Sequence, residues 1–181
     1  MLDELKDCLW KNFAASIDML SNAIEFCSDE QWNSNKKFFY ISYHCAVFLD
    51  YYLTIPPYKF SSPLPYTLTE AENIPPDAVD DVVPDKHYSK KDLIDYIQYS
   101  REKLRKLIKG LTEENINSKW LVNSNDLNLD LASSSSMELS ILGILFYNLR
   151  HTQHHAAQLN LLLRQSIDSA PDYVSAAIDD L

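Results

Sequence analysis

Two histidines in the last third of the chain stand at a spacing that suits a metal ion. His151 and His155 are four residues apart, so on a helix their Cβ atoms lie about 6 Å apart on one face. Two neutral imidazole nitrogens at that spacing can each bind one ion at about 2.0–2.1 Å. The spacing is weak evidence by itself, because random placement of five histidines gives roughly 0.1 such pairs per chain. The surrounding residues must therefore support the interpretation.

The helix face that carries this pair is apolar and is interrupted by a compact polar patch. It continues through Asn148 on one side and Gln158 on the other. Burying two imidazoles and an amide without partners costs about 1–3 kcal/mol per group, and one metal ion would satisfy the imidazoles together. Tyr147, Asn148 and Gln158 are candidates to hydrogen-bond the imidazoles and orient them. For Tyr147 and Asn148, the alternative is simple packing between helices.

An earlier segment offers a third histidine. His44 lies between Ile41 and Phe48 on the apolar stripe of a segment with helical periodicity. A lone histidine there is more often a core residue bound to a backbone group. Together with His151 and His155 it would instead complete a facial set of three imidazoles. A divalent ion held in this way keeps its charge and leaves coordination positions open, which is typical of catalytic rather than structural sites.

The elements that must position these residues are helices. Apolar residues recur at three- and four-residue steps, the period of amphipathic helices, over residues 2–27, 36–53, 89–110 and 136–165. The 181 residues include only two glycines, which argues against glycine-rich phosphate loops and against a sandwich or barrel with many tight turns. We therefore predict one all-α domain over residues 1–181, a four-helix bundle. Seven of its eight prolines lie between Pro56 and Pro84, which predicts a long proline-rich crossover between helices 2 and 3.

Capping residues mark where these helices begin and end. Ser89 is the predicted N-cap of the third helix, and Gly110 is predicted to end it in the left-handed conformation. Ser135 with Glu138 predicts a capping box at the start of the fourth helix. A short amphipathic turn is predicted for the last ten residues.

The combination of His44 with the segment His151-Thr-Gln-His154-His155-Ala-Ala-Gln158-Leu159 resembles the DinB/YfiT-like metalloenzyme superfamily. The resemblance covers nearly the whole chain and implies a four-helix bundle with a long crossover between the second and third helices. It also implies that His44, His151 and His155 are the metal ligands, whereas His154 is not.

The last residues of that segment match the family only in part. Gln158-Leu159 corresponds to the end of the family's usual Gly-Gln-Leu, and Ala157 takes the place of the glycine. The substitution affects helix packing beside the site and not the predicted ligands. Carboxylate-bridged di-iron bundles need Glu-x-x-His on two helices, a pattern that this sequence lacks.

The resemblance implies an activity as well. The characterised members of the family are similar to thiol-dependent transferases and isomerases that use bacillithiol or mycothiol, and other members are regarded as metal-dependent hydrolases. The expected cofactor is a divalent ion (zinc, nickel or iron) that activates water or a low-molecular-weight thiol for hydrolysis or transfer on a small substrate. The pocket would lie between helices 2 and 4, with residues 56–88 as a candidate lid. The alternative is a non-catalytic binding or dimerisation module with a vestigial or structural metal site.

Composition narrows the range of partners. Acidic residues outnumber basic ones 26 to 16, for a net charge of −10, so the chain would repel a nucleic-acid backbone or an anionic membrane surface. The longest uncharged apolar stretch, 139–149, is too short to span a bilayer, and the N-terminus lacks a signal-peptide pattern. Three cysteines without paired spacing suit a reducing compartment. We expect a cytoplasmic protein with a small-molecule substrate, and its aromatic residues are compatible with a homodimer.

Overall fold

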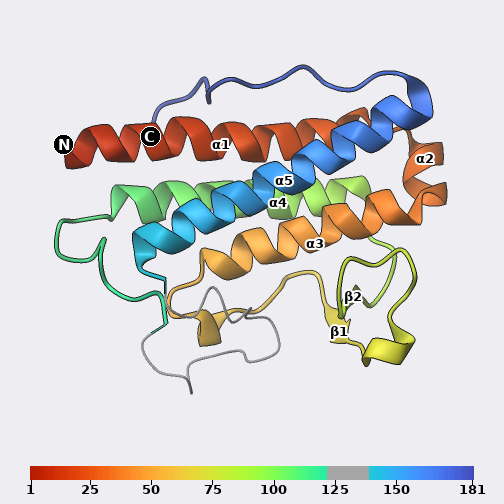
Figure 1. Cartoon of the computed structure of the whole chain (residues 1–181), viewed down its shortest axis with the longest axis horizontal. Coiled ribbons are helices and arrows are strands. Elements are labelled where there is room, and N and C mark those ends of the chain that lie inside the picture. The colour runs from red at the N-terminus through yellow and green to blue at the C-terminus, as the bar shows by residue number, and fades with distance from the viewer. Residues whose placement is uncertain (122–138) are drawn as a thin grey trace.

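The computed structural model describes residues 1–121 and 139–181, and this part of the chain is mostly helical (Figure 1). The four long helices are α1 (Leu2–Phe26), α3 (Lys36–Tyr52), α4 (Lys90–Lys109) and α5 (Ile141–Ile167), and the short helix α2 (Asp29–Ser34) joins α1 to α3. Helix α1 packs against α4 and α5, and α3 packs against the same two helices. The predicted helical class is confirmed, whereas the predicted set of four helices is incomplete.

A single apolar core fills the space between the long helices. Trp10 and Phe13 of α1, Phe38 of α3 and the later Trp120 are buried in it. Fully burying an apolar side chain of this size contributes about 1.5–3 kcal/mol. Trp120 also donates its indole N–H to the carbonyl of Thr54, 3.1 Å away. The core therefore holds α3 and α5, the two helices with the histidines of interest, in fixed positions.

The ends of α4 test two of the predicted caps. Ser89 is the N-cap, and its hydroxyl accepts a hydrogen bond from the N–H of Asp92 while the Asp92 carboxylate accepts from the N–H of Ser89. This prediction is confirmed. The prediction for Gly110 is wrong, because its φ is −77° and therefore right-handed. The helix instead closes with a tighter last turn, in which Leu111 donates to the carbonyl of Ile108.

Helix α5 begins later than its apolar periodicity suggested. Ser140 is its N-cap and accepts a hydrogen bond from the N–H of Gly143 at 3.1 Å. The predicted capping box of Ser135 and Glu138 lies outside the described residues. At the other end, Asp168 adopts φ = 54° and is the one described residue other than glycine with a positive φ.

The crossover from α3 to α4, residues 53–89, contains the strands that the sequence did not predict. Strands β1 (Tyr66–Leu68) and β2 (Val82–Pro84) form an antiparallel pair in which Leu68 faces Val82. Single 3₁₀ turns occur at Pro57–Lys59 and Ala71–Asn73. Strand β2 packs against α3, as Figure 1 shows. The loop between the strands is thereby brought beside the helix that bears His44.

The C-terminal segment, residues 168–181, contains no helix, so the predicted amphipathic turn there is wrong. The segment runs back along α1 (Figure 1). Ala177 donates its N–H to the carbonyl of Lys11 at 2.9 Å, and Trp10 donates its indole N–H to the carbonyl of Asp179 at 2.9 Å. Its backbone groups find partners on α1 instead of within a helical turn. Among the described helices, none has a stretch long and apolar enough to cross a membrane.

Candidate metal centre

Helices α3 and α5 bring the three predicted histidines together. We call His44, His151 and His155 the imidazole cluster. The Nε2 atom of His151 lies 3.0 Å from Nε2 of His44 and 3.1 Å from Nε2 of His155. Two nitrogens bound to one ion at about 2.1 Å, with an angle of about 90–110° between the bonds, lie about 3.0–3.4 Å apart. The ligand atoms of all three histidines lie within 4.8 Å of one another, so the cluster could hold one ion.

Aromatic rings border the imidazole cluster. The ring of Phe48, one turn beyond His44 on α3, lies 4.5 Å from the His44 ring and 5.9 Å from the His151 ring, centre to centre. Tyr52, a further turn along, lies 5.9 Å from His151. These side chains follow the inward stripe of α3, so the same periodicity that places His44 also supplies an apolar wall beside it.

Burial keeps the imidazoles of His151 and His155 neutral. His44 and His155 are only 8% and 5% exposed. Desolvation, followed by the neighbouring His155 and His44, lowers the pKa of His151 to about 2. Desolvation, followed by His44, lowers the pKa of His155 to about 4. Because neutral imidazole is the form that binds metals, these two side chains are in the binding form at neutral pH.

The second nitrogen of each imidazole has a different environment. The Nδ1–H of His155 donates to the side-chain oxygen of Gln158 at 2.8 Å. An amide oxygen can only accept, so the hydrogen is on Nδ1 and the Nε2 lone pair faces the cluster. Nδ1 of His44 lies 2.9 Å from a carboxylate oxygen of Asp80. Nδ1 of His151 is buried and has no hydrogen-bond partner among the described residues.

Of the three residues predicted to orient the imidazoles, Gln158 contacts one, and the structure gives the other two different partners. Asn148 donates its side-chain N–H to the carbonyl of Leu49 at 2.9 Å. That carbonyl is free because the last turn of α3 tightens, so Leu53 donates to Asp50 instead. Tyr147 packs edge-on against Tyr52, with their ring centres 5.1 Å apart. Asn148 thus links α5 to α3 directly.

Reasoning from the sequence missed Asp80 as a residue near the candidate centre. Asp80 lies in the loop between β1 and β2, and its side chain is 30% exposed. It stands among other acidic residues of the crossover, and no periodicity distinguishes it from Asp77, Asp81 or Asp85. The proximity of this carboxylate to His44 depends on the unpredicted sheet, which brings the loop against α3.

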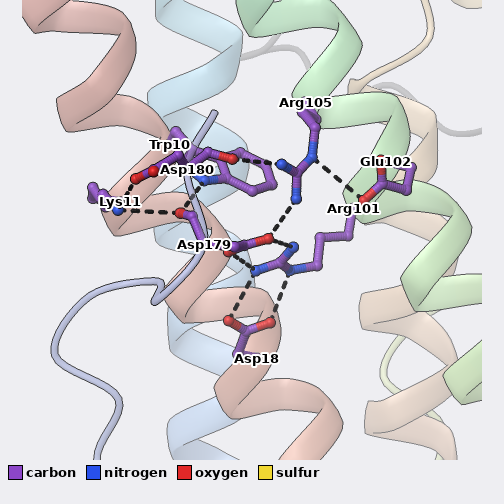
Figure 2. A network of polar contacts seen from close by, with 8 residues as sticks. All are labelled: Trp10, Lys11, Asp18, Arg101, Glu102, Arg105, Asp179 and Asp180. Atoms are coloured by element: carbon purple, nitrogen blue, oxygen red, sulfur yellow. Dashed lines mark hydrogen bonds and ion pairs between the residues drawn. The ribbon is translucent and has the colours of Figure 1, made fainter.

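A second polar cluster lies on the other side of the core, between α1 and α4, and its charged side chains pair with one another. We call Asp18, Arg101, Arg105 and Asp179 the arginine clasp (Figure 2). Arg101 donates to Asp18 at 2.8 Å and to Asp179 at 2.8 Å. Arg105 also pairs with Asp179. The guanidinium groups of both arginines lie over the ring of Trp10, at 4.8 and 4.2 Å.

The two polar clusters therefore differ in how their polar groups are paired as well as in composition. The carboxylates of the arginine clasp neutralise its cations and fix the C-terminal segment to α1 and α4, which is a structural role. The imidazole cluster has no comparable set of partners. No family model matches the chain, and no significant match was found among curated proteins or solved structures, so the geometry of the imidazole cluster is the observation from which function must be inferred.

Proposed function

We propose that this chain is a metal-dependent enzyme in which His44, His151 and His155 hold one divalent ion, with zinc, nickel or iron as the candidates. Its reaction would be hydrolysis, or transfer involving a low-molecular-weight thiol, on a small substrate. The observation that carries the proposal is that Nε2 of His151 lies 3.0 Å from Nε2 of His44 and 3.1 Å from Nε2 of His155, with the ligand atoms of all three within 4.8 Å of one another. In this proposal the four long helices form the bundle of a DinB/YfiT-like enzyme, in agreement with the resemblance of the sequence.

The hydrogen-bonding balance of the imidazole cluster supports a cation. The Nε2 atom of His155 carries a lone pair, because its hydrogen is on Nδ1. One hydrogen on Nε2 of His151 can bond well with only one of its two close neighbours, so the Nε2 lone pair of the other neighbour is left without a donor. Leaving one buried polar atom unpaired costs about 1–3 kcal/mol. A cation facing three lone pairs would remove this deficit.

The chain's own residues would prepare the site for chemistry. When bound, a divalent cation lowers the pKa of a water or thiol in contact with it, which supplies a nucleophile near neutral pH. Three neutral imidazoles leave the full charge of the cation available for this effect. Phe48 and Tyr52 exclude water from one side of the site, and Gln158 holds the His155 ring in place.

Metal content is the direct test. Protein expressed in metal-supplemented medium should contain about one equivalent of divalent metal per chain by elemental analysis. His151→Ala and His155→Ala should lose it, because each removes one of three ligands. His154→Ala is the matched control, since it removes an exposed imidazole next to His155 on the same helix. A metal-free wild-type protein, or full metal retention in folded His151→Ala, would overturn the proposal.

Cobalt substitution then distinguishes an enzyme from a non-catalytic module. A cobalt-loaded enzyme should change its visible spectrum when a small thiol or an anion is added, because a coordination position is open. A spectrum that does not respond to either addition would mean a closed site, and it would favour a structural metal in a binding or dimerisation module.

A further inference from the structure

Asp80 approaches the imidazole cluster from outside the helices that form it. Its Oδ2 atom lies 2.9 Å from Nδ1 of His44. That nitrogen is buried and makes no conventional hydrogen bond with any described residue. The carboxylate is therefore the acceptor available to a hydrogen on Nδ1.

The crossover holds the carboxylate of Asp80 in place. Its other oxygen, Oδ1, accepts the backbone N–H of Val82 at 3.1 Å. Val82 is buried and pairs with Leu68 in the small sheet. Thr69 donates its N–H to the carbonyl of Asp81 at 2.9 Å, which closes the loop between the strands. One carboxylate oxygen is thus anchored to the backbone, and the other faces His44.

We propose that Asp80 is a positioning residue of the candidate metal centre, which keeps the hydrogen of His44 on Nδ1 and the lone pair of Nε2 directed at His151 and His155. The inference rests on the proposed function, because it assigns Asp80 a role toward the same ion. Metal-bound histidines commonly donate their second ring N–H to a carboxylate, which fixes the tautomer and the ring orientation. Without an acceptor at Nδ1, the hydrogen is free to move to Nε2 and block it.

The environments of the three histidines explain why this contact matters. His155 is oriented by Gln158 from its own helix, whereas Nδ1 of His151 has no partner among the described residues. His44 is the only member of the imidazole cluster on α3, and its acceptor comes from the crossover. Metal affinity should therefore depend on the order of a loop that contributes no ligand.

The experiment compares metal affinity in wild-type protein, Asp80→Ala, Asp80→Asn and the control Asp81→Asn, each titrated with cobalt in competition with a chelator. Loss of such a partner typically weakens metal binding 10- to 100-fold, and we expect a loss in that range for Asp80→Ala. Asp80→Asn, which keeps an acceptor oxygen, should lose less. Asp81→Asn removes the same charge from the neighbouring position and should bind like wild type. Cobalt-saturated Asp80→Ala should keep the wild-type spectrum.

Three results would overturn the role of Asp80 while leaving the proposed function intact. Unchanged affinity in Asp80→Ala would remove the role altogether. An equal loss of metal affinity in Asp81→Asn would mean that removing any nearby negative charge has the same effect. A spectrum of saturated Asp80→Ala that indicates one ligand fewer would make Asp80 a ligand and not a positioning residue.

If the wild-type protein binds no metal, the proposed function fails, and Asp80 is then tested in the metal-free protein. The ¹⁵N shifts of the His44 ring report which nitrogen carries the hydrogen. The Nδ1–H form should dominate in wild type and decline in Asp80→Ala, and identical shifts in the two proteins would overturn the inference.

Discussion

The imidazole cluster between α3 and α5 and the arginine clasp between α1 and α4 are both polar groups beside the apolar core, and they differ in which groups pair within them. In the clasp, the cation of Arg101 meets the carboxylates of Asp18 and Asp179 (Figure 2). In the cluster, Nε2 of His151 lies 3.0 and 3.1 Å from the Nε2 atoms of two further imidazoles. Buried polar groups normally have partners. A cluster in which three bases converge could hold a metal ion, whereas one in which opposite charges pair supports the fold.

The sharpest test of this contrast is a pair of substitutions in metal-free protein. Arg101→Ala should lower the free energy of unfolding by about 1.5–3 kcal/mol, because it removes charge-assisted hydrogen bonds to Asp18 and Asp179, whose carboxylates are partly screened by solvent. His151→Leu should change it by about 1 kcal/mol or less, because it removes a side chain whose Nδ1 has no partner. Urea denaturation with a chelator present measures both. Similar losses in the two variants would mean that the cluster is as structural as the clasp.

Adding metal should stabilise the clasp variant and leave the cluster variant unchanged. A free ion at 100 times its dissociation constant stabilises the protein by about 2.7 kcal/mol, since it binds the folded state. Wild type and Arg101→Ala should both gain this amount, whereas His151→Leu should gain none. Thermal melts with and without zinc provide the measurement. A gain in His151→Leu equal to that of wild type would place the bound ion elsewhere.

Acid should weaken the two regions over different pH ranges. In metal-free protein, the pKa of His155 falls from its ordinary 6.5 to about 4, so between these values the unfolded chain binds more protons than the folded one. Stability should therefore decrease as pH falls from 6.5 toward 4, by up to about 1.4 kcal/mol per pH unit for this histidine. His151 shifts in the same direction. His155→Gln should make this part of the profile less steep, with His151 accounting for the slope that remains.

The clasp should respond only at lower pH. The pKa of Asp179 is lowered from its ordinary 3.8, first by its hydrogen bond with Arg101. Its contribution is thus fully present above pH 3.8 and is lost as the pH falls further. A stability profile that is flat between pH 6.5 and 4 in wild type would contradict the neutral, buried state of the imidazoles.

The smallest expected effect concerns the C-terminal segment. Asp179→Asn should lower stability by about 1 kcal/mol, because its carboxylate is 38% exposed and solvent screens its pairs with the arginines. Asp180→Asn, whose side chain is 95% exposed, is the control and should match wild type in a denaturation curve. A loss of several kcal/mol in Asp179→Asn would show that the clasp contributes more than its exposure suggests.

Residues with a regular local pattern were predictable from the sequence, and those defined by distant contacts were not. The apolar stripes predicted the long helices and placed His44, His151 and His155 on inward faces. The Ser89 cap followed from its own neighbours. Asp80 was not predictable, because its contact with His44 requires a loop between two short strands to pack on α3. Asp179 reaches Arg101 only because the C-terminal segment runs back along α1.

The tightened last turn of α3 has a consequence for how α5 is held against α3. It frees the carbonyl of Leu49, which Asn148 then occupies from α5, one turn before His151. A hydrogen bond between partners 99 residues apart thereby adds to the apolar packing that holds α5 against α3. The face of α5 that bears His151 is turned toward His44, and the bond lies one turn away from that contact. An irregularity at the end of one helix thus helps to hold the three imidazoles together.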